Sequence, residues 1–143
     1  MRVVVTGSRT WDRPSTVYLA LNGLLAIGEP LVLFHGAARR GTDCHAESWA
    51  IEAQRVGRDV TIRRFPAMWS QGRAAGRSRN AEMIGVFSEE GGGLCLAFLR
   101  DNSPGTTHAI QCAAKRSNIL TTIFDYAQAE RIEADLRERT AAH

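Results

Sequence analysis

Residues 2–9 read RVVVTGSR, and this short stretch decides the fold. Its apolar part, residues 2–6, shows no alternation of polar and apolar side chains, which is typical of a strand buried on both faces of a parallel sheet. Four similar runs follow, separated by helical patterns. The sequence therefore predicts the α/β class: a Rossmann-like, doubly wound parallel sheet of about five strands with helices on both faces. The other predicted strands are residues 31–34, 60–65, 94–99 and 119–124.

The predicted helices lie between these strands. The clearest spans residues 14–27, because Pro14 starts it and Gly28 ends it. Residues 66–78 have no apolar period and are expected to form an ordered loop. The other helices are expected from Asp43, which can cap its helix, to Gly57, over residues 79–87 and 106–115, and from Tyr126 until it frays by Thr140.

Length and composition fit a single globular domain. The chain has 143 residues, of which 44% are hydrophobic and 23% charged, and these values argue against disordered proteins, fibrous proteins and disulfide scaffolds. The formal net charge is +3, from 18 basic and 15 acidic residues, and every basic residue except Lys115 is Arg. Because Arg binds planar anions through a fork of N–H groups, a phosphate-containing partner is a natural expectation, although genome composition explains the same bias.

Cysteine usage indicates the environment of the protein. Cys44, Cys95 and Cys112 are odd in number and show no CxxC spacing, which argues against both a zinc site and a disulfide framework. No segment matches a signal peptide or is long enough to cross a bilayer. We therefore expect a cytoplasmic protein with no metal, no bound cofactor and no membrane partner.

Three polar segments follow predicted strands: residues 6–9, 35–36 and 101–107. In a doubly wound sheet, ligands bind beyond the carboxyl ends of the strands, so we expect these segments to converge on one crevice. The first of them is not a GxGxxG motif, and a standard dinucleotide-binding turn is therefore not predicted.

Residues 103–106, SPGT, open a predicted helix. The N–H groups and dipole of a helix N-terminus attract anions, and Gly105 would let a phosphate oxygen approach closely. The same residues also fit an ordinary turn that caps a helix. Residues 7–9 have the same two interpretations.

Several other side chains could complete the crevice, and each has a structural alternative. Arg79 could bind a phosphate or ribose oxygen and Asn80 could donate and accept hydrogen bonds, or both could be a solvated cap. Trp11 or Trp69 could stack on a nucleobase or could cover a helix end. Similar pairs of alternatives apply to His35, as a ligand contact or a structural residue, and to Asp43, as a partner of a ribose hydroxyl or only an N-cap.

Four motifs occur in order along the chain: VTGSRTW at 5–11, HGAARRGTD at 35–43, AMWxxGRAAGxxRNAEM at 67–83 and SPGT at 103–106. In this order they resemble the SLOG superfamily, and within it the small YspA-like, YpsA-related proteins. The resemblance implies a SLOG-type Rossmann-like domain over residues 1–124, with a C-terminal helix over residues 125–143 that packs on it or extends from it. It also implies a pocket for nucleotides or nucleotide-derived ligands.

The same resemblance includes the Lonely Guy phosphoribohydrolases, which are dimers and release the base from a nucleoside monophosphate. Their site pairs an Arg in RKxEM with a Glu in PGGxGTxxE. Arg79 and Glu82 match the first motif as RNAEM, but the second is reduced to SPGT and no acid follows it. Because the reaction needs a carboxylate near the glycosidic bond, the comparison implies binding more strongly than hydrolysis. It also implies a homodimer.

The leading expectation is a sensor or sequestering protein for a nucleotide-derived molecule such as an ADP-ribose derivative. One alternative is a nucleoside-monophosphate phosphoribohydrolase with Asp43, Glu82 or His108 as its acid–base group, although Glu82 could instead pair with Arg79 on the same helix. Another is binding of single-stranded nucleic acid, for which a charge of +3 is weak support. The candidates for catalysis are Arg79, Glu82 and His108, and those for ligand binding are Gly7, Ser8, Arg9, Trp11, His35, Gly36, Asp43, Trp69, Arg73, Arg79, Asn80, Ser103, Gly105 and Thr106.

Overall fold

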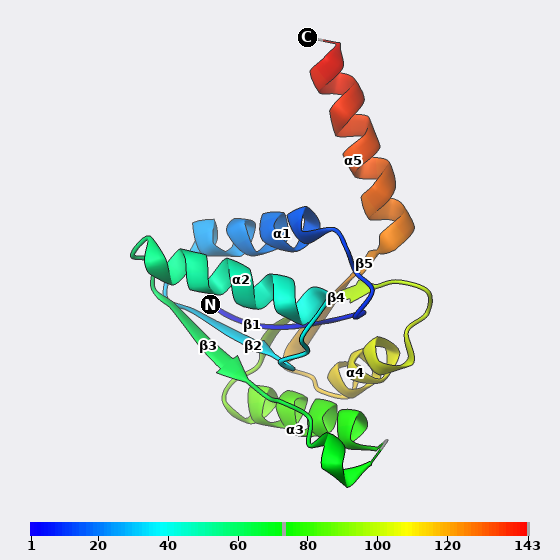
Figure 1. The fold of residues 1–143 in the computed structure, drawn as a ribbon. Helices are drawn as coiled ribbons and strands as arrows, with labels where there is room; N and C mark the ends of the chain where they lie inside the picture. Colours follow the sequence, from blue (N-terminus) through cyan, green and yellow to red (C-terminus); the bar gives the residue numbers. More distant parts are fainter. Residues whose placement is uncertain (73, 143) are drawn as a thin grey trace.

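The computed structural model describes residues 1–72 and 74–142. Its centre is a five-stranded parallel sheet with the strand order β3-β2-β1-β4-β5 (Figure 1). Both neighbours of β1 run parallel to it, and the order reverses between β1 and β4. The predicted α/β class and the Rossmann-like, doubly wound sheet are therefore confirmed. The strands are β1 (Arg2–Gly7), β2 (Leu31–His35), β3 (Val60–Arg64), β4 (Gly93–Leu99) and β5 (Ile119–Asp125).

Helices cover both faces of this sheet (Figure 1). One pair, α1 and α2, lies on one face, and the other pair, α3 and α4, lies on the opposite face, whereas α5 projects from the end of β5. None of the described helices is both long and apolar enough to cross a membrane. The helices are α1 (Pro14–Ile27), α2 (Thr42–Arg55), α3 (Ala75–Glu89), α4 (Pro104–Ala114) and α5 (Tyr126–Ala141), with a short 3₁₀ helix η1 (Trp69–Gln71).

The central strand β1 is buried because it is apolar on both faces. Val3 and Val5 pack into the cluster beneath α1 and α2, whereas Val4 packs with Phe34 and Phe87 on the α3 side, and all five are fully buried. Burying one such aliphatic side chain stabilises the folded state by about 1.5–3 kcal/mol. Packing on both faces thus fixes β1 in the middle of the sheet and places its following turn at the centre of the carboxyl edge.

Residues 66–78 are not entirely a loop, contrary to the prediction. α3 begins at Ala75, four residues before the expected start, and continues to Glu89. The first turn of α3 has no apolar period in its sequence, but the tertiary structure buries Ala75, and Ala has a high helix propensity. Arg79 and Asn80 therefore lie in the second turn of this helix rather than in its first.

α5 is fastened to the sheet domain at its base. The hydroxyl of Tyr126 donates to Asp12 Oδ1 at 2.7 Å, and Arg13 forms an ion pair with Glu133. Beyond these contacts the helix extends away from the sheet, as Figure 1 shows, and it runs to Ala141. The division into units 1–124 and 125–143 stays a prediction.

Candidate functional site

A cleft of about 880 Å³ lies at the carboxyl edge of the sheet, where the strand order reverses. This is the place at which doubly wound sheets bind ligands. The three polar segments, residues 6–9, 35–36 and 101–107, all contribute to its lining. Of the residues named above as candidates for ligand binding, those that line the cleft are Gly7, Ser8, Arg9, Gly36, Asp43, Trp69, Arg79, Asn80, Ser103, Gly105 and Thr106.

Trp11 does not lie at the cleft. Its ring is 1% exposed and packs edge-on against Phe98 and Tyr126, and its Nε1 donates to the carbonyl oxygen of Arg13 at 3.0 Å. The expectation that Trp11 could stack on a base is therefore wrong. An indole between two other rings gains more from burial than a rim position would give, because aromatic side chains bury a large apolar area.

His35 is also away from the cleft and has a structural role. Its Nε2 bonds to Glu47 Oε1 at 2.8 Å, and its Nδ1 accepts from the N–H of Ala37 at 2.9 Å. Both ring nitrogens are thus used within the protein, and the ring is buried. Of the two interpretations of His35, the structural one is correct.

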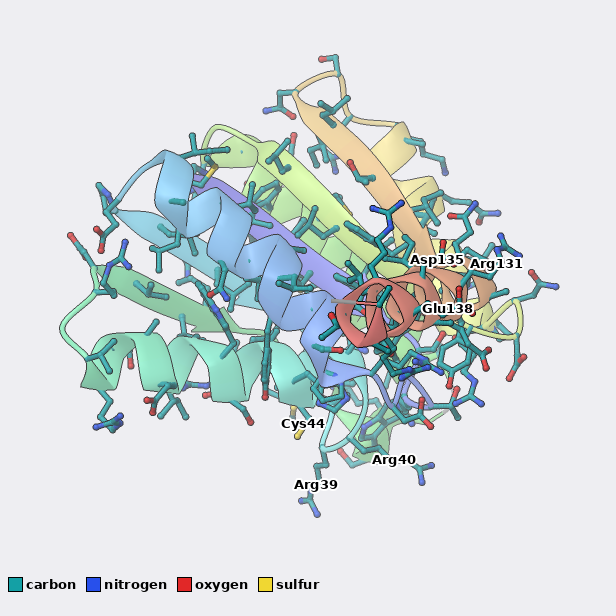
Figure 2. All side chains as sticks on the ribbon, turned by 90° about the horizontal axis from the view of Figure 1, so that it is seen from above. Arg39, Arg40, Cys44, Arg131, Asp135 and Glu138 are labelled. Carbon is teal, nitrogen blue, oxygen red and sulfur yellow. The ribbon has the colours of Figure 1, made fainter. Side chains whose placement is uncertain are left out.

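Glu82 is exposed on α3 and does not line the cleft. The ion pairs of the described residues do not include one between Glu82 and Arg79, so the expected pairing on the helix is wrong. Arg73 lies outside the described residues. The motif arginines Arg39 and Arg40 are exposed and point away from the molecule in the view from above (Figure 2).

Arg79 reaches the cleft from α3 with a charge that no carboxylate of the described residues pairs. Its Nε donates to Asn80 Oδ1 at 2.8 Å, and its Nη1 donates to the carbonyl oxygens of Gly36 and Phe65. Desolvation lowers the pKa of Arg79, whereas the nearby charge of Asp43 raises it. The guanidinium is thus half-buried, fixed in orientation and suited to an anion.

The N-terminus of α4 also lines the cleft. The N-cap residue Ser103 makes no side-chain capping bond, Pro104 has no N–H, and Thr107 N–H donates to the carbonyl oxygen of Ser103 at 3.0 Å. Among the described residues, no acceptor is bonded to the N–H groups of Gly105 and Thr106, and a Cβ of Gly105 would point into open space beyond its own helix. Open N–H groups of this kind bind anions.

Asn80 connects Arg79 with the start of α4. Its Oδ1 accepts from Arg79 Nε, and its Nδ2 donates to the carbonyl oxygen of Gly105 at 3.2 Å. Asn80 is buried, and both ends of its amide are bonded to protein. It therefore holds the guanidinium and the helix N-terminus next to each other, a positioning role that its sequence environment alone did not reveal.

Trp69 and Arg9 form part of the rim. The guanidinium carbon of Arg9 lies 4.8 Å from the centre of the Trp69 ring. On α3, Gly76 gives that ring room, because a Cβ there would lie 3.1 Å from it. The ring is 53% exposed, so an aromatic surface supported by a cation is accessible from the cleft.

Asp43 brings a buried carboxyl group to the cleft from the first turn of α2. Its Oδ2 accepts from the N–H of Ala38 at 3.2 Å, and no donor of the described chain is bonded to its Oδ1. Burial raises the pKa of Asp43, against the lowering effects of His35, the Ala38 N–H and Arg79. The expected N-cap role is wrong, because Gly41 occupies the N-cap position and α2 starts before Asp43.

Ser8 and Gly7 shape the floor of the cleft. The hydroxyl of Ser8 accepts from the Arg100 N–H at 2.9 Å and donates to the Arg100 carbonyl oxygen at 3.2 Å. The carbonyl oxygen of Ser8 accepts from the N–H of Thr42 at 3.3 Å. A Cβ on Gly7 would collide with the Thr42 side chain, so glycine is required for α2 to start this close to β1.

Some cleft residues were not named individually from the sequence, although those within residues 101–107 were expected at the crevice as part of that segment. Asp101 and Asn102 both have positive φ, 55° and 49°, which Asp and Asn tolerate better than other residues with a side chain. The Asp-Asn pair between a strand and a proline was an available signal for such a turn. No such signal predicts that Arg77 lines the cleft, because its position depends on α3 starting earlier than the sequence indicates. The additional lining residues include Thr10, Arg77, Met83, Arg100, Asp101, Asn102, Thr107 and Gln111.

The titratable side chains at the cleft are those of acid–base chemistry rather than of a metal site. Within residues 1–72 and 74–142, no three His, Cys, Asp or Glu side chains are grouped to hold a metal ion. His108 lines the cleft, and Cys112 Sγ lies 3.6 Å from its Nε2 on the same helix. Desolvation, followed by the charge of Arg77, lowers the pKa of His108. The ring is therefore neutral near pH 7.

Comparisons with known proteins place the chain in a family. The model of the YspA, cpYpsA-related SLOG family matches residues 1–72, which extend from β1 through η1. The chain is also similar to the Gene 61 protein of Mycobacterium phage D29, with 40% identity over 116 residues that cover 80% of this chain and 89% of the phage protein. The family match includes Asp43 and Trp69 and ends before Arg79. The resemblance drawn from the motifs is confirmed, and the chain belongs to the YspA, cpYpsA-related SLOG family.

Proposed function

We propose that the protein binds a nucleotide-derived small molecule in the cleft and acts as a sensor or sequestering protein. Family membership supports a nucleotide-related ligand. The observation that carries the proposal is the half-buried guanidinium of Arg79, which has no carboxylate partner in the described chain and is joined through Asn80 to the open N-terminus of α4. One phosphate group would neutralise the charge of Arg79 and also accept hydrogen bonds from the open helix N-terminus. The guanidinium would bond to its oxygens from one side, and the N–H groups of Gly105 and Thr106 would bond to them from the other.

The rest of the ligand would extend from this phosphate along the cleft. A nucleobase would stack on the exposed ring of Trp69, which Arg9 supports from 4.8 Å away. Asp43 would accept a hydrogen bond from a ribose hydroxyl through its free Oδ1. A cleft of about 880 Å³ has room for a ligand of this kind, since small-molecule sites span roughly 300–1,000 Å³.

Calorimetry with AMP, ADP, cyclic AMP and ADP-ribose tests this function, with adenosine as the ligand that lacks phosphate. We expect at least one phosphorylated ligand to bind and adenosine to bind more weakly. Arg79→Gln should weaken binding at least about tenfold, which corresponds to about 1.4 kcal/mol. The matched control is Arg55→Gln, an exposed Arg bonded to Glu52 on α2, which should leave the affinity unchanged. Absence of binding by every ligand at high micromolar concentration would refute the proposal.

A second candidate is hydrolysis of nucleoside monophosphates, and one observation favours it. Asp43 is a buried carboxyl group in the cleft whose pKa is raised by burial, as a general acid requires. His108 also lines the cleft, whereas Glu82 does not. Incubation with AMP and chromatography for free adenine distinguishes the two functions. Release of adenine that Asp43→Asn abolishes would establish the enzyme, and intact AMP would support the binding protein.

We also propose a homodimer in the cytoplasm, following the resemblance to the dimeric phosphoribohydrolases. All three cysteines are free thiols, which is compatible with a reducing compartment.

A further inference from the structure

The outer strand β5 has an uncovered apolar face. In the register of β4 and β5, Leu94 pairs with Leu120 and Phe98 pairs with Phe124. Because side chains alternate along a strand, Leu120 lies on the same face as Phe98, which packs in the cluster beneath α1 and α2. Figure 2 shows α1 and α2 on this face toward the β3 edge of the sheet, whereas the first part of β5 has no helix in front of it. Leu120 is accordingly 69% exposed.

One edge of α1 extends this apolar face. Thr16 bonds to Glu133 of α5, so its edge of α1 faces α5. Asn22 accepts from Trp49 of α2, so the other edge of α1 faces α2. At helical spacing, Leu24 and Ile27 follow the edge of Thr16. Ile27 is 75% exposed. We call Leu24, Ile27, Leu94 and Leu120 the open β5 face. Parallel sheets normally bury both faces beneath helices, and this face has no helix of its own.

α5 carries a matching apolar stripe. Ala129, Ile132 and Leu136 are spaced by three and four residues, so they lie along one side of the helix. Ala129 is buried against the domain, but Ile132 is 59% and Leu136 is 50% exposed. We call Ile132 and Leu136 the α5 stripe. The stripe is beside charged residues such as Arg131, Asp135 and Glu138, all labelled on α5 in Figure 2.

The α5 stripe cannot contact the open β5 face of its own chain unless the hydrogen bonds and ion pair at the base of α5 are broken. The carboxylate of Glu133 bonds to Arg13, to Ser15 at 2.8 Å and to Thr16. Tyr126 is held by Asp12. These contacts direct α5 away from the sheet, as Figure 1 shows, so that the stripe stands clear of the domain from which it comes.

We propose that two copies of the chain exchange α5, the α5 stripe of each lying on the open β5 face of the other. Each chain carries one α5 stripe and one open β5 face. A single two-fold axis therefore buries both stripes and both faces of the dimer. The exchanged helix supplies the layer that β5 lacks. The cleft lies at the carboxyl edge and contributes neither half, so this inference does not depend on the identity of the ligand.

Sedimentation and light scattering of the full chain test the exchange. The wild type should have twice the 15.7 kDa mass of one chain. Leu120→Arg and Leu136→Glu should each weaken the dimer by about 10²- to 10⁴-fold, because the two-fold dimer contains each contact twice and so loses the burial of two Leu side chains. Leu19→Arg is the matched control, since Leu19 is 64% exposed on another side of α1 and should leave the dimer intact. Circular dichroism of the variants verifies their folding.

A mixture of the two charged variants is the sharpest experiment. In a mixed dimer, one contact keeps both Leu side chains and the other pairs Arg at 120 with Glu at 136, so the dimer should return at equal concentrations. A wild type that stays monomeric at high micromolar concentration overturns the proposal. So does loss of the dimer in Leu136→Glu but not in Leu120→Arg, because that result means that the α5 helices pair with each other.

Discussion

At the scale of single residues, the cleft contains a cation and a carboxyl group that do not form an ion pair. Arg79 comes from α3 and Asp43 from α2, and a Cβ at Gly36 would approach both side chains. The charge of each affects the pKa of the other. Because they do not pair with each other, both groups can still form hydrogen bonds with a ligand in the cleft. The arrangement therefore favours ligand binding rather than stability.

Asp43 should make an unusual contribution to the pH dependence of stability. Because burial raises its pKa in the folded state above the unfolded value, its contribution is fully present below the unfolded pKa and is lost as the pH rises through the folded pKa. Asp43→Asn, which keeps an acceptor for the Ala38 N–H, should remove this loss. Urea unfolding from pH 3 to pH 8 should therefore show the variant gaining free energy of unfolding relative to wild type as the pH rises. A constant difference would contradict the prediction.

Trp69 should report ligand binding by fluorescence. It is the exposed tryptophan, whereas Trp11 and Trp49 are buried in the core. A base that stacks on Trp69 should quench its emission, and Trp69→Phe should lose the ligand-dependent change while the two buried rings keep a constant signal. The same fractional change in the variant and the wild type would place the base elsewhere.

At the scale of elements, glycines decide how closely the helices approach the strands. Gly36 at the end of β2 makes room for the guanidinium of Arg79 from α3. Gly23 lies inside α1, and among the described residues a Cβ of Gly23 would meet open space beyond the backbone of its own helix. The same residue type therefore has a packing role in one element and only a conformational cost in the other.

The substitutions Gly36→Ala and Gly23→Ala should consequently have opposite effects. The first forces Arg79 to move and should weaken ligand binding, because the added Cβ collides with Nη1. The second removes backbone freedom in a helix interior and should raise the free energy of unfolding by about 0.5–1 kcal/mol with unchanged affinity. Thermal unfolding and calorimetry of both variants provide the check. Equal affinities would show that Arg79 does not contact the ligand.

At the scale of the whole molecule, some of the arginines are neutralised by acidic side chains and others are not. Arg13, Arg55, Arg58, Arg63 and Arg64 all pair with glutamates. Among the arginines that line the cleft, Arg100 pairs with Asp12 and Asp101, whereas the ion pairs within residues 1–72 and 74–142 do not include Arg9, Arg77 or Arg79. The net charge of +3 is thus a poor guide to the ligand, because it does not show that three arginines without an ion pair in the described chain line the same cleft.

A small ligand in this cleft can place few phosphate groups on these three arginines, which predicts that its affinity depends only weakly on salt. Raising the salt concentration from about 50 to 200 mM should weaken a small phosphorylated ligand by less than about tenfold, whereas a nucleic acid with many phosphate contacts would lose about 10³- to 10⁵-fold. Titrations of ADP-ribose and of a single-stranded oligonucleotide at both salt concentrations compare the two directly. Tight, steeply salt-dependent binding of the oligonucleotide would favour the nucleic-acid function instead.

The sequence predicted the strands well because their signal is local. A continuous run such as residues 2–6 is typical of a strand in a parallel sheet, and turn residues end it. The run of β5 follows the same pattern, although Leu120 is exposed at the edge of the sheet. The sequence failed to predict the start of α3, because Ala75 and Arg77 show no apolar period and the burial of Ala75 depends on the tertiary structure. For Trp11 and His35 the sequence left a ligand contact and a structural role both open, because the surroundings that decide between them are built by Phe98, Tyr126 and Glu47 from distant segments.

By itself, therefore, the sequence determined the α/β class, the parallel sheet, the family and the segments that meet at the carboxyl edge. These follow from hydrophobic patterns and turn chemistry, which act between neighbouring residues. Only the tertiary structure decided which polar atoms remain free at that edge, such as the N–H groups of Gly105 and Thr106, and which are used up, such as the hydroxyl of Ser8. The reason is physical: whether a donor or a charge is available to a ligand depends on partners that folding brings from far along the chain.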